Sequence, residues 1–199
     1  MNVDEFLSDL YNDELSDMFI GNRNSKEEPR AKLLPLMNKA MLQAYAKYNI
    51  KLDVYSLTVT TDEHTYTLEA LDLLAVIGVV NVHNRVLEPH EVRILGDVLY
   101  FPCPEAVELT VMYKVKPERF TEAQVDEDIK IELPELLLPW MSSWVAARTF
   151  LSRKDDTSIG KGTELMQLAN TFEETYQATN TTNEFTKPDH TKLYARGFC

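Results

Sequence analysis

The stretch from Met37 to Val59, MNKAMLQAYAKYNIKLDVYSLTV, changes its hydrophobic period midway. Its first half continues a helical stripe made of Leu33, Leu34, Met37, Ala40, Met41, Ala44, Tyr45 and Tyr48. From Val54 onward the residues alternate between apolar and polar, which is typical of a half-buried strand. The stretch therefore predicts a helix that ends near Tyr48 and is followed by β-structure.

Two helices are expected before this change. Residues 2–18 form the first, with Val3, Phe6, Leu7, Leu10, Leu15 and Met18 roughly on one face. The second begins after a capping box, Ser25-x-x-Glu28, and continues to about residue 48. Pro35 falls in its early turns, where a proline either kinks the helix or marks its true start.

After the change, short β-rich segments follow one another over about residues 54–116. VYSLTVTTDEHTYTLEA predicts a hairpin with TDEH as its loop. The later segments are LLAVIGVVNVH, VRIL, VLYFP and VELTVMYKVKP, each bounded by Gly, Pro or Asp. The spacing predicts one small antiparallel sheet of five or six strands.

Helical period returns over residues 134–178. Leu137, Trp140, Met141, Trp144, Arg148 and Leu151 share a face, and Pro139 suggests a first-turn kink or a later start. A loop, SRKDDTSIGKG, separates this helix from a last one, expected from Thr163 to Ala178. The prediction is an α+β protein: one domain, residues 1–178, in which two N-terminal and two C-terminal helices form a bundle around an inserted sheet. Residues 179–199 are expected to be an extended arm.

Composition narrows the classes of function. The chain has 199 residues, 44% of them hydrophobic, and a net charge of −12 from 32 acidic and 20 basic residues. This balance argues against tight binding to a phosphate backbone, which needs clustered Lys and Arg. No apolar stretch approaches membrane-spanning length, and the acidic start is unlike a signal peptide. We therefore expect a protein of a cytoplasm-like compartment, without membrane contact.

No catalytic, cofactor or metal site is predicted. IGKGT lacks the glycine and the strand that a phosphate loop requires. A loop contains four residues of metal-ligating type, His83, Glu88, His90 and Glu91, at a spacing that favours a solvated loop. The carboxylates of the acidic connector, Glu122, Asp126, Glu127, Asp128, Glu132 and Glu135, favour a solvated face. Four aromatic residues at helical spacing are expected in the core or a subunit interface: Trp140, Trp144, Phe172 and Tyr176.

The order of these segments resembles that of the head-to-tail adaptor (connector) proteins of tailed bacteriophages, especially the short-tailed podovirus type. EPRAKLLPLMNKAMLQAYAKYNI is similar to their early helix, with an Asn-x-Ala motif at Asn38-Lys39-Ala40. TYTLEALDLLAVIGVVN resembles a strand, a turn and a second strand that leads into a variable loop. VELTVMYKVKPERFT resembles their last strand. LPELLLPWMSSWVAARTFLSR and the helix ending in FEETYQA resemble their closing helix pair.

The resemblance implies a structural virion protein rather than an enzyme. Such adaptors form a ring, usually of twelve copies, under the portal protein, extend the DNA channel and provide a platform for a tail nozzle or tube protein. DNA would pass through without specific binding, and the protein would lie at the head-tail junction of the virion after assembly in the host cytoplasm. No cofactor is implied.

The resemblance also gives the chain's last residues a role. In these adaptors a C-terminal arm can lie along the portal or a neighbouring subunit. Here the expected anchors in TKLYARGFC are Leu193, Tyr194, Arg196 and Phe198. Aromatic side chains bury a large area for few frozen torsions.

Two alternatives stay open. One is another phage tail-completion or head-closure protein, and the other is a small phage hydrolase that uses the acidic connector.

Overall fold

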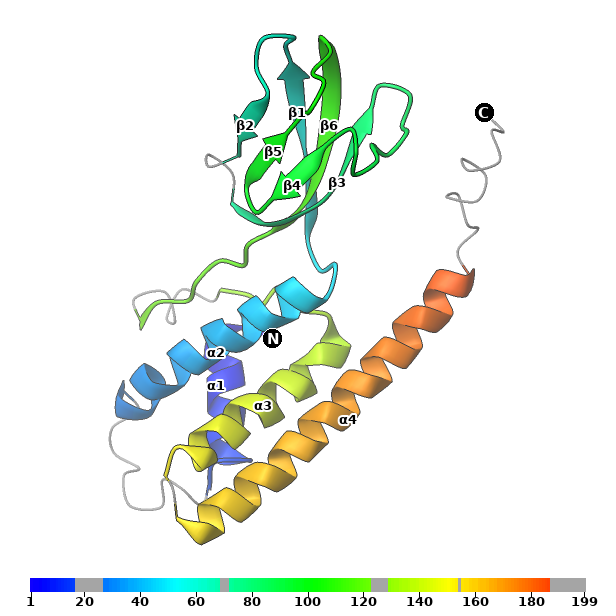
Figure 1. The fold of residues 1–199 in the computed structure, drawn as a ribbon. Helices are drawn as coiled ribbons and strands as arrows, with labels where there is room; N and C mark the ends of the chain where they lie inside the picture. The colour runs from blue at the N-terminus through cyan, green and yellow to red at the C-terminus, as the bar shows by residue number, and fades with distance from the viewer. Residues whose placement is uncertain (17–26, 69–71, 123–128, 154, 187–199) are drawn as a thin grey trace. The chain divides into compact units, whose positions relative to one another are not determined.

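The computed structural model describes residues 1–16, 27–68, 72–122, 129–153 and 155–186 (Figure 1). Within these ranges the chain forms four α-helices, a short 3-10 helix and six strands, so the predicted mixed α+β class is confirmed. The chain divides into two compact units. The first contains Met1–Met37 and Thr121–Cys199, and the second contains Asn38–Phe120, which includes the predicted β insertion.

Helix α1, Val3–Asn12, begins the first unit. The Asn2 side chain accepts a hydrogen bond from the Glu5 amide at 2.7 Å, and the Glu5 carboxylate accepts one from the Asn2 amide at 2.8 Å. This reciprocal capping box fixes the start of the helix. The amide of Val3 donates to the carbonyl of Ile129 at 3.0 Å, which ties the N-terminus to the connector. The helix is shorter than the predicted 2–18 because its hydrogen bonding ends in a turn after Asn12.

Helices α3, Leu138–Leu151, and α4, Asp156–Thr186, form the C-terminal pair. A 3-10 turn, Glu135–Leu137, precedes α3 and places Pro139 in its first turn, where the missing amide costs no helical hydrogen bond. The α-helix thus starts later than residue 134, which was one of the two outcomes expected from Pro139. The buried side of α3 contains Trp140, Met141, Ser143, Trp144, Val145, Ala146, Ala147 and Phe150.

Both predicted ends of the last helix are wrong. It starts at residue 156 rather than at Thr163, because the Asp155 carboxylate accepts a hydrogen bond from the Ser158 amide at 2.9 Å and caps the first turn. It continues beyond Ala178 to Thr186, so the first part of the expected extended arm is helical. Thr175 and Thr179 donate their hydroxyl protons to the carbonyls four residues earlier, at 2.8 and 2.9 Å. Hydroxyl bonds of this kind satisfy the threonine side chains inside the helix without adding to its stability.

Gly162 lies where α4 meets α3. A Cβ atom at this position would come 2.8 Å from Leu151 Cγ and 3.1 Å from the Ala147 carbonyl oxygen. Gly160, one half-turn away, has no atom within 4 Å of the same construction. The two glycines of IGKG therefore differ in their surroundings. Gly162 permits a close approach of the two helices, whereas Gly160 faces open space.

We predict that Gly162→Ala lowers the free energy of unfolding by about 1–3 kcal/mol through overpacking. Gly160→Ala is the matched control and should raise it by about 0.5–1 kcal/mol, because alanine is the better helix former. Urea denaturation followed by tryptophan fluorescence would measure both. Equal effects of the two substitutions would contradict the close packing at Gly162.

The second unit contains two three-stranded antiparallel sheets (Figure 1). One has the order β1-β6-β3 and the other β2-β5-β4. The strands are β1 Leu52–Val59, β2 Thr65–Thr67, β3 Leu73–Asn81, β4 Arg93–Leu95, β5 Val98–Tyr100 and β6 Val107–Val115. The number of strands agrees with the prediction, but the prediction of a single sheet is wrong.

The predicted hairpin around TDEH is also absent from the pairing of the described strands. β1 pairs with β6 from Leu52↔Lys114 to Val59↔Val107, whereas β2 pairs with β5. Residues 60–64 carry the chain from one sheet to the other instead of folding it back within one. A core built from both sheets holds them together: Leu57, Val59, Leu68, Val79, Val92, Leu99, Phe101, Leu109 and Val111. Alternation along each strand marks the buried face but does not identify the partner strand.

Helix α2, Glu27–Lys47, is divided between the two units after Met37. It starts well before Pro35, which lies inside it, so this proline does not mark the helix start. Asn38 is the first residue of the second unit, and Phe120 is its last residue. Two hydrogen bonds join them. Asn38 Nδ2 donates to the Phe120 carbonyl at 2.9 Å, and the Phe120 amide donates to Asn38 Oδ1 at 2.8 Å. We call this pair of bonds the Asn38 clasp.

We predict that Asn38→Ala destabilises the second unit by about 1–3 kcal/mol, because it leaves the polar backbone groups of the buried Phe120 without their partner. Lys39→Ala, an exposed neighbour in the same helix, is the control and should have little effect. Hydrogen exchange of β6 amides would report the change. Unaltered exchange in the Asn38 variant would show that the clasp does not stabilise this unit.

Candidate interaction surface

The loop between β3 and β4 begins as a tight hairpin. The Leu87 amide donates to the Val79 carbonyl at 2.8 Å, and the Asn81 amide donates to the Arg85 carbonyl at 3.0 Å. The hairpin closes over three residues and places Asn84 at φ 58°, in the left-handed region that Asn tolerates best after Gly. The segment after the hairpin thus lies along the outer side of β3.

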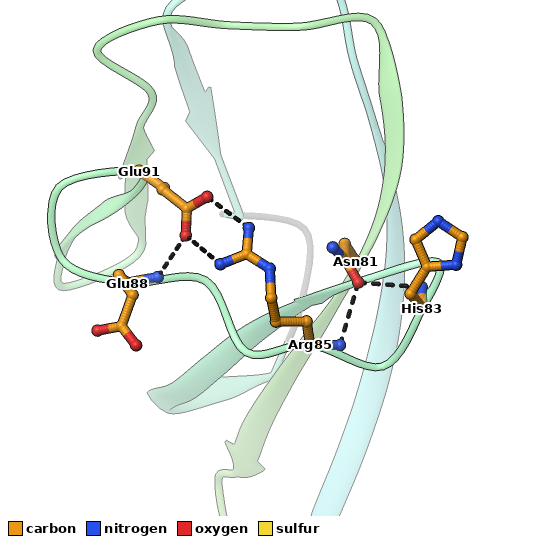
Figure 2. A network of polar contacts seen from close by, with 5 residues as sticks. All are labelled: Asn81, His83, Arg85, Glu88 and Glu91. Atoms are coloured by element: carbon orange, nitrogen blue, oxygen red, sulfur yellow. Dashed lines mark hydrogen bonds and ion pairs between the residues drawn. The ribbon is translucent and has the colours of Figure 1, made fainter. Parts of the chain in front are cut away.

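A network of polar contacts fixes the rest of this loop (Figure 2). Asn81 Oδ1 accepts hydrogen bonds from the amides of His83 and Arg85, at 2.9 and 3.0 Å. The Arg85 guanidinium forms a two-pronged ion pair with Glu91, whose second oxygen also accepts the Glu88 amide at 2.8 Å. A planar fork on a carboxylate restrains both distance and orientation. The loop is therefore held in one shape by its own side chains.

The electrostatics of Glu91 follow from this geometry. Hydrogen bonding from Arg85, and then from the Glu88 backbone, lowers the pKa of Glu91 from 4.5 to about 2. The pKa of Arg85 is raised, chiefly by the same hydrogen bond to Glu91. The pair stays ionised over the whole physiological range of pH.

The loop presents apolar side chains beside this network. Val82 is 61% exposed and Val86 is 55% exposed. A Cβ atom built on Gly78 would lie 3.9 Å from Val86 Cγ1 and 3.6 Å from Met112 Cε, so these two side chains lie over Gly78. They are on the face of the β1-β6-β3 sheet opposite to the core.

This face extends onto β1. Val54 is opposite Met112, which in turn is opposite Gly78. Val54 is 62% exposed and Leu52, two residues earlier on the same face, is 53% exposed. We call Leu52, Val54, Val86 and Met112 the outer strip. Apolar side chains gathered on one exposed face are typical of a surface that contacts another molecule.

The sequence-predicted aromatic positions lie mostly in the interior. Trp140 and Trp144 are buried with ring centroids 6.5 Å apart, and Arg148 lies over the Trp144 ring at 5.1 Å. Tyr176 is buried as well, whereas Phe172 is half-buried. The expected tail anchors Leu193, Tyr194, Arg196 and Phe198 lie outside the described residues.

The residues weighed for chemistry are not brought together. Among the described residues no group of three or more His, Cys, Asp or Glu side chains is placed to hold a metal ion. Glu91 is bonded to Arg85 instead of converging with His83 and His90. IGKGT lies in the first turns of α4, as a helical segment rather than a loop. In the connector Glu122, Glu132 and Glu135 are exposed, and 123–128 lie outside the described residues. None of the described helices is long and apolar enough to cross a membrane.

Sequence reasoning missed the outer strip. Leu52 and Val54 were included in the helix-to-strand change, yet an alternating pattern cannot say which face of a strand is covered. The only sequence signal was that apolar residues occur at both odd and even positions within residues 51–55 and within VVNVH.

Comparison with known proteins adds no relative. No protein-family model matches the chain, and no curated protein matches it either.

We predict that the loop conformation survives acid to well below pH 4. A carboxyl group whose pKa is lowered on folding stabilises the folded loop above its ordinary pKa of 4.5 and loses that contribution only as the pH falls toward about 2. Nuclear magnetic resonance should show the Glu88 amide shifting with a midpoint near 2. Glu91→Gln should remove the transition, and a midpoint near 4.5 would contradict the ion pair.

Proposed function

We propose that this protein is a structural head-to-tail adaptor of a short-tailed bacteriophage. In this proposal it forms a ring, of twelve copies, under the portal protein and extends the DNA channel. The ring provides the attachment platform for a tail nozzle or tube protein at the head-tail junction of the virion, after assembly in the host cytoplasm. The protein acts as a scaffold rather than as an enzyme.

The observation that carries the proposal is the order of elements around the Asn38 clasp. The chain runs from helices through a β unit, Asn38–Phe120, to the α3–α4 pair, as the resemblance to adaptors implies. Asn38 belongs to the Asn-x-Ala motif that carries this resemblance, and it holds the far end of the β unit. Ala40 of the same motif is fully buried.

The surface of the β unit supports an assembly role. Three residues of the outer strip, Leu52, Val54 and Val86, are exposed, and Met112 is half-buried. The β3–β4 loop next to the strip is fixed by the Asn81 and Arg85–Glu91 bonds. A preorganised loop loses little conformational entropy when it docks. The finer arrangement that we propose is a bundle of the two N-terminal and two C-terminal helices, with the β unit as an insertion.

Charge supports the proposed relation to DNA. With a net charge of −12 per chain, a ring would be a strongly acidic body. Few phosphate contacts would hold DNA, so it could pass along the channel without specific binding.

In the same proposal the residues after α4 act as an arm. Because α4 extends to Thr186, the arm is shorter than the sequence suggested and comprises residues 187–199. Leu193, Tyr194 and Phe198 would be its anchors on the portal or a neighbouring subunit, and Arg196 would pair with a carboxylate there. The acidic chain supplies many such carboxylates.

We predict that removing residues 187–199 leaves the melting temperature of the folded chain nearly unchanged and sharply reduces attachment to the portal. The double change Tyr194→Ala and Phe198→Ala should reproduce most of the loss, since these side chains have the largest apolar area to bury on docking. Co-sedimentation with purified portal and electron microscopy of the complex would measure attachment. Cys199→Ser is the control and should bind normally.

If the truncated chain joins the portal as tightly as the full chain, the arm is not an anchor. If the full chain forms no ring with portal, the adaptor proposal itself is wrong. In that case rings formed with a tail protein alone would favour the tail-completion alternative. Hydrolytic activity of the monomer, lost on a single change in the acidic connector, would favour the enzyme.

A further inference from the structure

Helix α4 has apolar side chains that its contacts with the described elements leave partly uncovered. These contacts are chiefly with α3 and the 3-10 turn before it (Figure 1). The most buried residues of α4 share one side of the helix: Ser158, Gly162, Ala169 and Tyr176. Beside them, Leu165 and Phe172 are half-buried and Leu168 is 45% exposed. Because residues three and four positions apart are neighbours on a helix surface, we call Leu165, Leu168 and Phe172 the α4 stripe.

The surroundings of the α4 stripe are acidic. Asp156–Thr186 contains five acidic residues and one basic residue, a net charge of −4. Glu164 is exposed and lies four residues before Leu168, so it is next to the stripe on the helix surface. A segment that covers the stripe should therefore combine apolar side chains with positive charge.

The residues after α4 have this composition. Residues 187–199, which we call the tail, contain three basic residues and one acidic residue, a net charge of +2 in a chain whose total is −12. The tail also contains Leu193, Tyr194 and Phe198. It is thus opposite in charge to α4 and carries apolar side chains that could cover the stripe.

The tail is long enough to reach the stripe of its own chain. Pro188 cannot continue a helix, so the chain leaves the axis of α4 there. Phe172 and Leu165 lie about 21 and 32 Å back from the last residue of α4, at a rise of 1.5 Å per residue. Tyr194 and Phe198 lie up to about 26 and 40 Å after it in an extended chain, at 3.3 Å per residue. Each length of tail exceeds the matching length of helix, which leaves chain for the reversal of direction.

Tethering favours the stripe of the same chain over that of a second copy. A segment that is joined to its site by a short linker meets it at an effective concentration in the millimolar range. A second copy would have to reach that concentration to compete. The geometry of one chain is therefore sufficient to bring the tail and the stripe together.

We propose that in the free chain the tail folds back along α4, with Tyr194 against Phe172 and Phe198 against Leu165, and covers Leu168 between them. This contact hides the side chains that the adaptor proposal assigns to the portal, so attachment to the portal has to open it. Only this last step rests on the adaptor proposal. A contact that opens on docking is weakly stable, so removing the tail should still change the melting temperature little.

A spin label on Cys199 of the full chain tests the fold-back, in a Cys103→Ser background because Cys103 is exposed. The label directly follows Phe198, so the methyl resonances of Leu165 and Leu168 should lose most of their intensity in nuclear magnetic resonance spectra. A freely moving tail would instead broaden the resonances at the end of α4 most. That result would overturn the proposal.

Two substitutions on α4 separate the stripe from the rest of the helix. Leu168→Lys should restore the Leu165 methyl intensity, because it places a charge in the apolar contact and repels the basic tail. Ile159→Lys is the matched control. Ile159 is 42% exposed and lies nine residues from Leu168, half a turn away around the helix, so its substitution should leave the broadening intact. Equal effects of the two substitutions would contradict the fold-back.

A charge exchange tests the register of the contact. In the fold-back Arg196, between the two aromatic residues, comes level with Glu164. Glu164→Lys and Arg196→Glu should each weaken the broadening, and the chain with both substitutions should recover it. Failure of the double variant to recover would show that these two residues do not meet.

A mixed sample distinguishes the same chain from a second copy. Isotope-labelled chains without a spin label are mixed with spin-labelled chains of natural isotope abundance. Broadening at Leu165 of the isotope-labelled chains would assign the tail to a neighbouring copy and overturn the proposal. Portal attachment is measured separately, so a chain that shows the fold-back but forms no ring with portal would refute the adaptor function alone.

Discussion

The two hydrogen bonds between the Asn38 side chain and the Phe120 backbone join the ends of an entire structural unit. The residues are 82 positions apart, and the six strands lie between them. Closing so long a loop costs conformational entropy, which the β core must offset. The clasp uses an amide side chain as a donor and an acceptor at once, as one residue of a β-ladder would. It lets the chain leave a helix, build two sheets and return within hydrogen-bonding distance of its starting point.

A second contact within the β unit reinforces this closure. Lys114, on β6, donates to the Ala46 carbonyl at 2.8 Å, in the last turn of α2. Carbonyls at a helix C-terminus lack intrahelical partners and carry partial negative charge. An ammonium group donates a hydrogen bond to such a carbonyl and is attracted by its charge. Leu52 is opposite Lys114 in the ladder, so this contact lies beside the outer strip. The end of the helix and the start of β1 are thus fixed by the central strand of the same sheet.

The sequence was informative wherever the signal is local. The period change after Tyr48 placed the end of α2 within a residue, and the strand segments were located because β-rich runs are bounded by Gly, Pro or Asp. What failed depends on contacts distant in sequence or on side-chain to backbone bonds. The pairing of β1 with β6 is set by the shared core, whereas α4 continues to Thr186 through a polar segment rich in Thr and Asn. Low helix propensity alone suggested an extended chain there. The outer strip could not be predicted because exposure of an apolar face is a property of the assembled sheet.

The length of α4 changes the geometry of the proposed arm. Residues 179–186 span about 12 Å as a helix, at 1.5 Å per residue, whereas an extended chain would span roughly twice that distance. A helix is also stiffer than an extended polar spacer, so in the proposed arm it would direct the anchors as well as displace them. In an assembled ring each copy would present its anchors from the end of a rigid rod, and the ordering entropy on docking would be confined to residues 187–199. With fewer residues to order, the proposed attachment would need less buried area, which Leu193, Tyr194 and Phe198 would supply.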